Sequence, residues 1–281
     1  MAGLRVAVVT GASRGIGRAI AVRLARSGYR LALLARDAGA LAETVEACKA
    51  AAAGVSGSGA EEQPEPKRRR TAEAAEAAAE AGGISDPSFL SYTVDMRDRA
   101  RVQEAVDGAA SALGGVSVLV CNAGVLLSTS AASGDPARWE EELDVNVKGS
   151  MSATRAALPH ILESEAATKG VIFIGSTGSQ WSFPYCGGYC ASKHALRGFA
   201  GSVFPEVRDK GVKVCMIMPG FTDTNMVAEN KGMVTERLMQ PDDVAHAVEC
   251  VLGFPPSACP TEMLIRPQYD CTDGSVPYTI V

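Results

Sequence analysis

The sequence predicts a single-domain α/β protein built on a doubly wound parallel sheet of seven strands, with helices on both faces. Short runs of β-branched and aliphatic residues alternate with helical patterns along the 281 residues, as expected for parallel βαβ units. Apolar residues make up 47% of the chain and aromatic residues only 5%, a mix that suits a buried parallel sheet better than a β-sandwich. The first strand also leads directly into a glycine-rich turn and a helix, which is the context of a dinucleotide site.

The predicted strands are short and apolar, and they are expected at residues 4–9, 30–36, 89–94, 116–121, 170–174, 212–218 and 263–265. Helices are expected from the glycine turn to about 26, at about 38–53, 97–113 and 136–163, around 189 to about 208, and at 241–252. The carboxyl ends of parallel strands meet at one edge of the sheet, where ligands bind in doubly wound folds. We therefore expect functional residues in the turns that follow the strands.

The turn after the first strand reads Thr10-Gly11-Ala12-Ser13-Arg14-Gly15-Ile16-Gly17. Glycines at the spacing Gly-x-x-x-Gly-x-Gly let backbone amides approach a pyrophosphate, and the N-terminus of the following helix adds partial positive charge. The turn therefore predicts a dinucleotide site. The alternative is a glycine-rich turn that binds nothing.

The end of the second strand bears on which dinucleotide is bound. An NAD enzyme usually has an acidic residue there to hold the ribose hydroxyls, whereas this chain has Ala35 and Arg36. Arg36 and Arg14 are suited to a 2′-phosphate, because the planar guanidinium binds phosphate through paired hydrogen bonds. The predicted cofactor is NADP(H). Asp37 weakens this prediction, since a carboxylate repels phosphate, and the alternative is that both arginines only face solvent.

Tyr189 and Lys193 are four residues apart in a predicted helix, so their side chains share one face. An ammonium beside a phenol favours the phenolate, so we expect Lys193 to lower the pKa of Tyr189 toward that of a general acid–base. A Tyr-x-x-x-Lys pair alone is unspecific, and the alternative is an ordinary pair on a helix surface.

Two segments depart from this regular pattern. Residues of about 54–86 form a low-complexity insertion, which includes the basic run 67–70 and a possible helix at 71–81. We interpret the basic run as part of a solvated insertion with matching acidic residues rather than as a nucleic-acid or nuclear-import signal. The tail at about 268–281 is expected to be loose or packed at an interface, and the alternative is a C-terminal peptide ligand for another domain.

Composition excludes several classes of function. The net charge of −5 offers no basic surface for nucleic acid, and no apolar run approaches the roughly 20 residues of a membrane span. The eight cysteines include no C-x-x-C pair, so we interpret them as reduced thiols, and no metal site is predicted. With no signal or transit peptide evident, a cytoplasmic protein is expected.

Several motifs in order give the chain its resemblance to the short-chain dehydrogenase/reductase family, from residue 4 to about 267 apart from the insertion. They are Thr10-Gly11-x-x-x-Gly15-x-Gly17, Asp95, Asn122-Ala123-Gly124, Asn146, Ser176, Tyr189-x-x-x-Lys193 and Pro219-Gly220. The resemblance implies a Rossmann-type fold. It also implies dimers or tetramers formed through the long helices that carry Asn146 and Tyr189.

The resemblance further implies roles for individual residues. Tyr189 is the expected proton donor to a carbonyl oxygen, and Lys193 is expected to lower its pKa and to hydrogen-bond the nicotinamide ribose. Ser176 is expected to polarise the carbonyl group. Asn146 is expected to hold a water molecule that links Lys193 to solvent.

The expected cofactor contacts lie in the turns after the strands and in the Tyr189 helix: Gly11, Ser13, Arg14, Gly15, Ile16, Gly17, Arg36, Asp95, Met96, Asn122, Ala123, Gly124, Tyr189, Lys193, Pro219, Gly220, Thr222 and Thr224. The expected substrate contacts are Ser176, Trp181, Phe183, Tyr185 and Tyr189. The three aromatic residues at 181–185 suggest an apolar pocket wall, and the alternative for them is packing or subunit contact.

The function predicted from these motifs is the NADPH-dependent reduction of a small-molecule ketone or aldehyde to an alcohol. The segment 219–226 is similar to that of 3-oxoacyl-thioester reductases, and general carbonyl reductases fit as well. One alternative is an NAD-dependent alcohol dehydrogenase of the same family. Another is a non-catalytic NADP-binding sensor or scaffold, against which the intact Ser176, Tyr189 and Lys193 argue.

Overall fold

The computed structural model describes residues 3–54, 88–228 and 232–273, in which seven strands form one parallel sheet. The strands are β1 (Val6–Thr10), β2 (Arg30–Ala35), β3 (Phe89–Thr93), β4 (Val118–Cys121), β5 (Lys169–Ile174), β6 (Val212–Pro219) and β7 (Glu262–Ile265). Their order in the sheet is β3-β2-β1-β4-β5-β6-β7, so the chain winds outward from β1 in one direction and then in the other. The predicted doubly wound, seven-stranded fold is confirmed.

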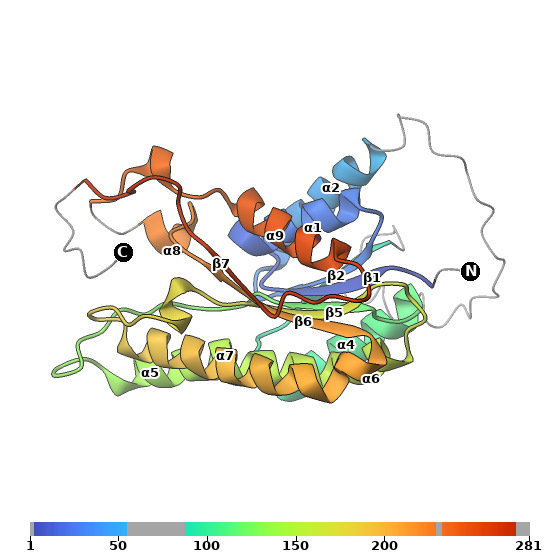
Figure 1. The fold of residues 1–281 in the computed structure, drawn as a ribbon, viewed down its shortest axis with the longest axis horizontal. Helices are drawn as coiled ribbons and strands as arrows, with labels where there is room; N and C mark the ends of the chain where they lie inside the picture. Colours follow the sequence, from blue (N-terminus) through green and yellow to red (C-terminus); the bar gives the residue numbers. More distant parts are fainter. Residues whose placement is uncertain (1–2, 55–87, 229–231, 274–281) are drawn as a thin grey trace.

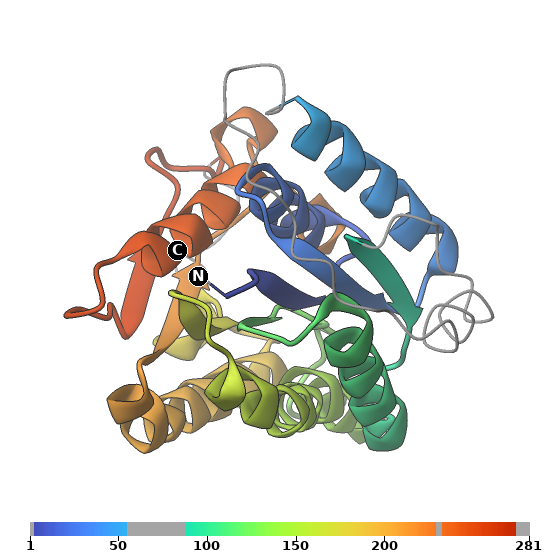
Figure 2. The same ribbon diagram turned by 90° about the vertical axis from the view of Figure 1, so that its right-hand side faces the viewer.

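Helices cover both faces of the sheet (Figures 1 and 2). One face carries α1 (Gly15–Arg26), α2 (Ala38–Ala53) and α9 (Pro241–Gly253). The other carries α4 (Arg99–Leu113), α5 (Pro136–Leu143), α6 (Ser150–Glu163) and α7 (Gly187–Val207), and a short α8 (Asn225–Ala228) follows β6. None of the helices in the described ranges combines the length and apolar character of a membrane span.

Alternate residues of each strand point to opposite faces and build two separate cores. In β1, Val6 and Val8 join the core under α4, α6 and α7, whereas Ala7 and Val9 join the core under α1, α2 and α9. Every residue of β1 is buried, as expected for a central parallel strand. The small side chains that the composition indicates allow the helices to pack closely on both faces.

Aspartate side chains set the start of several helices. Asp37, Asp98 and Asp135 accept hydrogen bonds from backbone amides in the first turns of α2, α4 and α5. The cap at Asp98 places the start of α4 at Arg99, two residues later than the sequence predicted. Among the described residues, no side chain caps α1 in this way.

The predicted helix at 136–163 contains a π-helical segment that the sequence did not reveal. Residues Asp144–Gly149 form this segment between α5 and α6, and it contains the buried Asn146. A π segment inserts extra backbone into a helix and rotates the following face. Gly149, the last residue of this segment, lies so close to the turn after β3 that an added Cβ would be 2.9 Å from Met96 Cβ.

The two irregular segments are described only in part. Residues 55–87, with the basic run and the possible helix at 71–81, lie outside the described ranges, as do 274–281. The first part of the tail is not loose. The amide of Val234 donates to Cys271 O at 2.8 Å, and the guanidinium of Arg237 donates to Asp270 O at 3.0 Å, so the tail folds onto the segment after β6.

Candidate active site

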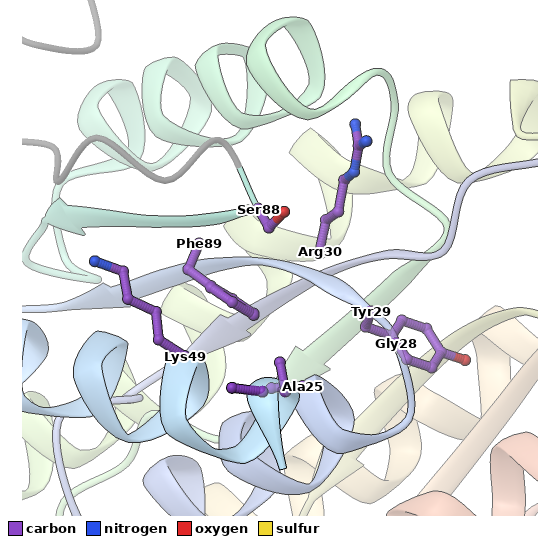
Figure 3. Close-up of a pocket in the computed structure, with 9 residues that line it drawn as sticks. Ala25, Gly28, Tyr29, Arg30, Lys49, Ser88 and Phe89 are labelled. Atoms are coloured by element: carbon purple, nitrogen blue, oxygen red, sulfur yellow. The ribbon is translucent and has the colours of Figure 1, made fainter. Parts of the chain in front are cut away.

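The predicted site residues lie where strands end, at the carboxyl edge of the sheet. Gly11 follows β1, Asn122 follows β4, Ser176 follows β5 and Gly220 closes β6. A hollow of about 400 Å³ lies elsewhere, at the amino ends of β2 and β3, and Figure 3 shows the residues that line it. Because the strands are parallel, that hollow is at the opposite edge of the sheet and has no part in the site described below.

Tyr189 and Lys193 share one buried face of α7. Their side chains are 7% and 4% exposed, and Lys193 Nζ lies 5.6 Å from the centre of the Tyr189 ring. The ammonium donates a hydrogen bond to Ile174 O at 3.0 Å, at the end of β5. The helix therefore holds the two side chains together above the exit of the central strands, as the spacing predicted.

Burial disfavours the charged form of both groups and shifts both pKa values accordingly. It raises the pKa of Tyr189 to about 12, against a smaller opposite effect from a hydrogen bond with Ser176. Burial also lowers the pKa of Lys193 to about 8. The expectation of a lowered pKa for Tyr189 is therefore wrong for this structure, because burial disfavours the phenolate more strongly than the hydrogen bond with Ser176 favours it.

Ser176 lies beside the Tyr189 ring in the turn after β5. It caps the short 3₁₀ helix Thr177–Ser179, where its Oγ accepts a hydrogen bond from Gly178 N at 3.0 Å. A Cβ at Gly178 would be 3.3 Å from Tyr189 Cε1 and 3.5 Å from Ser176 Oγ. The glycine thus permits the hydroxyl and the phenol ring to come together.

Asn146 fixes the exit of β4 next to Lys193. Its Oδ1 accepts from Val125 N at 2.8 Å, and its Nδ2 donates to Val125 O and to Ser192 Oγ, both at 2.9 Å. A Cβ at Gly124 would lie 3.2 Å from Asn146 Oδ1 and 3.5 Å from Lys193 Nζ. Asn146 therefore links the loop after β4 with α7, and Gly124 leaves room for the ammonium.

The glycine turn and the exit of β4 form one packed unit. Asn122 Nδ2 donates to Thr10 O at 3.0 Å and to Gly11 O at 3.1 Å, and Thr10 Oγ1 accepts from the amides of Asn122 and Ala123. Gly11 has a φ of +65°, and a Cβ there would be only 2.8 Å from Ala123 Cα. The side chain of Asn122 thus shapes the turn itself.

The start of α1 faces the segment after β6. The backbone at Arg14 enters the helix without a side-chain cap in the described structure, and Ser13 O is held by the Arg18 guanidinium at 2.8 Å. Gly15 has a φ of +54°, and a Cβ there would be 3.3 Å from Thr224 Cγ2. The first-turn amides of α1, including those of Ile16 and Gly17, therefore remain available to an anion.

Charged residues gather at the exits of β2 and β3. Arg36 is exposed, whereas the Asp37 carboxylate accepts from Ala40 N at 3.0 Å and so caps α2. Asp95 forms an ion pair of 2.6 Å with Arg97, and this hydrogen-bonded pair holds the pKa of Asp95 below its ordinary value, with a smaller contribution from Arg36. Met96, next to Asp95, is buried under the π segment.

The end of β6 lies against the chain that leaves β7. Pro219 is the last residue of β6, and a Cβ at Gly220 would be 2.9 Å from Pro267 Cδ. Thr222 is buried and pairs with Met239, and its carbonyl accepts from Thr224 Oγ1 at 3.2 Å. These residues form a wall beside the glycine turn.

The aromatic residues predicted to contact substrate lie at the surface beyond Ser176. Trp181 is exposed and lies under the Arg266 guanidinium, 5.7 Å from its ring centre, and Phe183 is half-buried. Tyr185 is 70% exposed and has a φ of +62°, a conformation that non-glycine residues rarely adopt. The three residues follow the 3₁₀ helix Thr177–Ser179, and the surface that they form is called the mouth below.

Two residues near the site were missed by sequence reasoning. Glu142 is buried at the end of α5, and Trp139 lies one turn before it. Glu142 belongs to the run 140–142 of three glutamates, which indicates a solvated helix surface. The only hint was the glycine pair at 187–188, because glycines before a helical Tyr189 indicate close approach of another element.

All eight cysteines are free thiols, as the sequence predicted. Burial raises the pKa of Cys186 and of Cys190, which flank Tyr189. Within the described ranges no group of His, Cys, Asp and Glu side chains is arranged to hold a metal ion.

Comparison with known proteins gives one consistent result. Residues 5–61 and 67–234 match the family model described as short chain dehydrogenase. A glycine betaine reductase of Emericella nidulans is 31% identical over 278 residues, which cover 94% of this chain but only 19% of that protein, so this chain spans about a fifth of that relative. A farnesol dehydrogenase of Aedes aegypti is 30% identical over 268 residues, covering 94% of this chain and 96% of that one.

A solved structure shows the same similarity in three dimensions. An alcohol dehydrogenase from the archaeon Thermococcus sibiricus, complexed with 5-hydroxy-NADP, has a TM-score of 0.75 and 28% identity over 95% of this chain and 97% of that one. The residues that match the family model include the glycine turn, Tyr189 and Lys193. The chain belongs to the short-chain dehydrogenase family, whose members are oxidoreductases that use a nicotinamide cofactor.

Proposed function

We propose that the protein reduces a ketone or aldehyde to an alcohol with NADPH, and that Tyr189 donates the proton. The observation that carries this proposal is the buried arrangement of Tyr189, Lys193 and Ser176 at the carboxyl edge of the sheet. A phenol, an ammonium and a hydroxyl around one point provide a proton, a positive charge and a hydrogen bond for a carbonyl oxygen that becomes an alkoxide.

A dinucleotide fits the residues at this edge. Among the described residues no side chain caps the first turn of α1, so its amides can bind an anion, and the glycines at 11 and 15 leave no side chain between these amides and a pyrophosphate. We assign its binding to Gly11, Ser13, Arg14, Gly15, Ile16, Gly17, Arg36, Asp95, Met96, Asn122, Ala123, Gly124, Tyr189, Lys193, Pro219, Gly220, Thr222 and Thr224. For Asn122 we infer that its contribution is to hold the turn, since its amide is bonded to Thr10 and Gly11.

The preference for NADPH follows from the exit of β2. The Asp37 carboxylate is bonded to the first turn of α2, which leaves the exposed Arg36 as the charged group for the adenosine ribose. A guanidinium favours a 2′-phosphate over a free hydroxyl. The related Thermococcus sibiricus enzyme is described with an NADP derivative, which is consistent with this proposal.

The chemistry divides among four side chains. The reduced nicotinamide supplies the hydride. The Tyr189 hydroxyl donates its proton to the carbonyl oxygen, and Ser176 donates a hydrogen bond to the same oxygen. Lys193 stabilises the phenolate that is left, and a water molecule held near Asn146 returns a proton from solvent through Lys193.

The substrate and the assembly are assigned in the same way. We propose that Trp181, Phe183 and Tyr185 contact the part of the substrate beyond its carbonyl group, because they form the mouth next to Ser176. We also propose a cytoplasmic homodimer or homotetramer.

The test compares NADPH and NADH oxidation with a panel of carbonyl compounds. The panel contains a 3-oxoacyl thioester, a 3-oxo acid ester, an aromatic diketone and a medium-chain aldehyde, and Tyr189→Phe serves as the blank. Turnover with NADPH that the variant loses is expected. A preference for NADH would instead indicate an NAD-dependent alcohol dehydrogenase. Nucleotide binding without turnover of any carbonyl or alcohol would indicate a sensor or scaffold.

A further inference from the structure

Glu142 is a buried carboxyl group next to the start of the catalytic helix. It is 1% exposed, and its Oε1 accepts a hydrogen bond from Leu127 N at 2.7 Å. Its Oε2 is buried and has no hydrogen-bond partner among the residues that the structure describes, and the same holds for Trp139 Nε1. A buried carboxylate oxygen without a partner is costly, so its presence at this place calls for a reason.

The carboxyl group reaches the residue directly before Tyr189. A Cβ at Gly188 would collide with Glu142 Oε2 and would lie 2.6 Å from Trp139 Cδ1. Only a glycine at this position lets α5 and the first turn of α7 approach so closely. Glu142 thus contacts two parts of the site at once, the loop after β4 through Leu127 and the start of α7 through Gly188.

The charges around Glu142 are few and lie on two elements. Burial raises the pKa of Glu142, whereas the amide of Leu127 and the Arg138 guanidinium favour its ionised form. From α7 and its N-cap, the titratable groups that face it are Cys186, Cys190 and Tyr189. For all three, burial is the main cause of a raised pKa, and a negative charge on Glu142 adds to it.

We propose that Glu142 is a positioning residue of the active site, which fixes the start of α7 against the loop after β4 and whose negative charge opposes ionisation of Tyr189. The proposal rests on the proposed role of Tyr189 as proton donor. When Tyr189 gives up its proton, the new phenolate and the Glu142 carboxylate repel each other across a buried space. The repulsion keeps Tyr189 in its protonated, proton-donating form up to a higher pH than burial alone would.

The test removes the charge and keeps the shape with Glu142→Gln, whose amide oxygen still accepts from Leu127. The matched control is Glu140→Gln, which removes the same charge from an exposed position on α5. The readout is the pH dependence of kcat/KM for carbonyl reduction, which is expected to fall first as Lys193 loses its proton and again, at higher pH, as Tyr189 ionises. We expect this second fall at a lower pH in Glu142→Gln and at an unchanged pH in Glu140→Gln.

A conservative variant separates charge from position. Glu142→Asp keeps the charge but shortens the side chain, so we expect a lower kcat with the alkaline fall at its original pH. If Glu142→Gln and Glu142→Asp both lower kcat without moving the profile, Glu142 acts by shape alone and the electrostatic proposal is overturned.

A second readout does not depend on turnover. The pH midpoint for alkylation of Cys186, followed on its peptide by mass spectrometry, is expected to fall in Glu142→Gln and not in Glu140→Gln. If carbonyl reduction survives in Tyr189→Phe, the proposed function is rejected and this proposal with it, even where the Cys186 midpoint shifts in Glu142→Gln. A shifted Cys186 midpoint with an unshifted rate profile would reject the coupling to Tyr189 alone.

If the Glu142 variants do not fold, the proposal can still be tested in the unaltered protein. Carboxyl-¹³C glutamate spectra are expected to show one signal that titrates above the ordinary range of exposed glutamates. If every glutamate titrates in that ordinary range, the buried carboxyl group is not perturbed as proposed, and the proposal fails.

Discussion

Gly11 shows how a single missing Cβ allows the glycine turn to form. Its φ is +65°, and an added Cβ would be 2.8 Å from Ala123 Cα and 2.9 Å from Asn122 Nδ2. Backbone conformation and contact therefore both require glycine here. Lys193 is constrained in a different way. The proposed reaction needs its positive charge, but the side chain is buried, and burial disfavours the charged form.

Gly11→Ala is expected to lose nucleotide binding and to lower the free energy of unfolding by about 2 kcal/mol or more. Gly28→Ala is the matched control, since Gly28 also has a positive φ, +77°, but its Cβ would meet nothing within 4 Å. That control is expected to lose about 1 kcal/mol and to bind nucleotide normally. Urea unfolding and nucleotide titration measure both effects, and equal losses of binding in the two variants would contradict the steric argument.

Lys193→Met is expected to abolish turnover and yet to stabilise the protein at neutral pH. Below a pH of about 8 the native state must carry a buried ammonium, while the unfolded chain holds this proton up to its ordinary pKa of 10.5. Between these pH values the unfolded state binds more protons, so the free energy of unfolding of the unaltered protein rises with pH. The stabilisation by Met is therefore expected to reach up to about 3 kcal/mol near neutral pH and to disappear above the unfolded pKa.

Urea unfolding of the nucleotide-free protein at several pH values measures this difference. The hydrogen bond from Lys193 to Ile174 O is lost in the variant and reduces the gain. A variant that is less stable than the parent at every pH would show that this bond outweighs the cost of burying the charge.

At the scale of elements, the helix starts decide where charge is available. The α2 helix is capped by Asp37, whereas α1 begins without a side-chain cap in the described structure. At α2 the Asp37 carboxylate therefore accepts from a first-turn amide, whereas at α1, which begins after Arg14, the first-turn amides are left to an external anion. The π segment also acts at this scale, because it brings Asn146 into hydrogen-bond contact with the loop after β4.

Variants at the exit of β2 separate capping from cofactor choice. Arg36→Ala is expected to weaken NADPH binding about 10-fold or more, with little effect on NADH, because a charge-assisted hydrogen bond to phosphate is lost. Asp37→Ala and Asp98→Ala are each expected to cost about 1 kcal/mol of stability as lost caps, with the NADPH preference unchanged. Dissociation constants for both nucleotides test this, and a preference for NADH in Arg36→Ala and the parent alike would remove the basis for the proposed selectivity.

At the scale of the whole molecule, the parallel sheet separates stability from chemistry. The two cores lie on its faces, whereas Tyr189 and Lys193, whose pKa values burial shifts, and the uncapped start of α1 lie at its carboxyl edge. The outer side of the α6 helix also leaves apolar side chains exposed: Met151 and Leu162 are eleven residues apart, close to three turns, and so share a face.

A paired substitution on that face tests assembly. Met151→Glu with Leu162→Glu is expected to convert a dimer or tetramer into smaller species without unfolding it, because charges are excluded from the apolar centre of an interface. Phe254→Glu, an exposed apolar position after α9, is the control and is expected to leave the mass unchanged. Light scattering after size exclusion gives the mass, and an unaltered mass in the paired variant would assign the interface to another face.

The sequence predicted the parts of the site whose signals are local. Strand, glycine turn and helix follow one another at Gly11, and the spacing of Tyr189 and Lys193 holds because four residues make about one helical turn. The raised pKa of Tyr189 was not predictable, since it depends on burial by distant residues. The π segment was missed because its side chains fit an ordinary helix, and Glu142 was missed because three consecutive glutamates resemble a solvated surface.

The segment after β7 ties the fold to the mouth of the site. Its backbone pairs with the segment after β6 at Val234 and Cys271, and Arg266 lies over Trp181. A chain that ended at residue 265 would keep every strand of the sheet and give the far-ultraviolet spectrum of an intact protein. It would nevertheless lose the contact of Arg266 with Trp181, a proposed substrate contact, so an unchanged spectrum is a poor criterion for choosing where to end or to tag this protein.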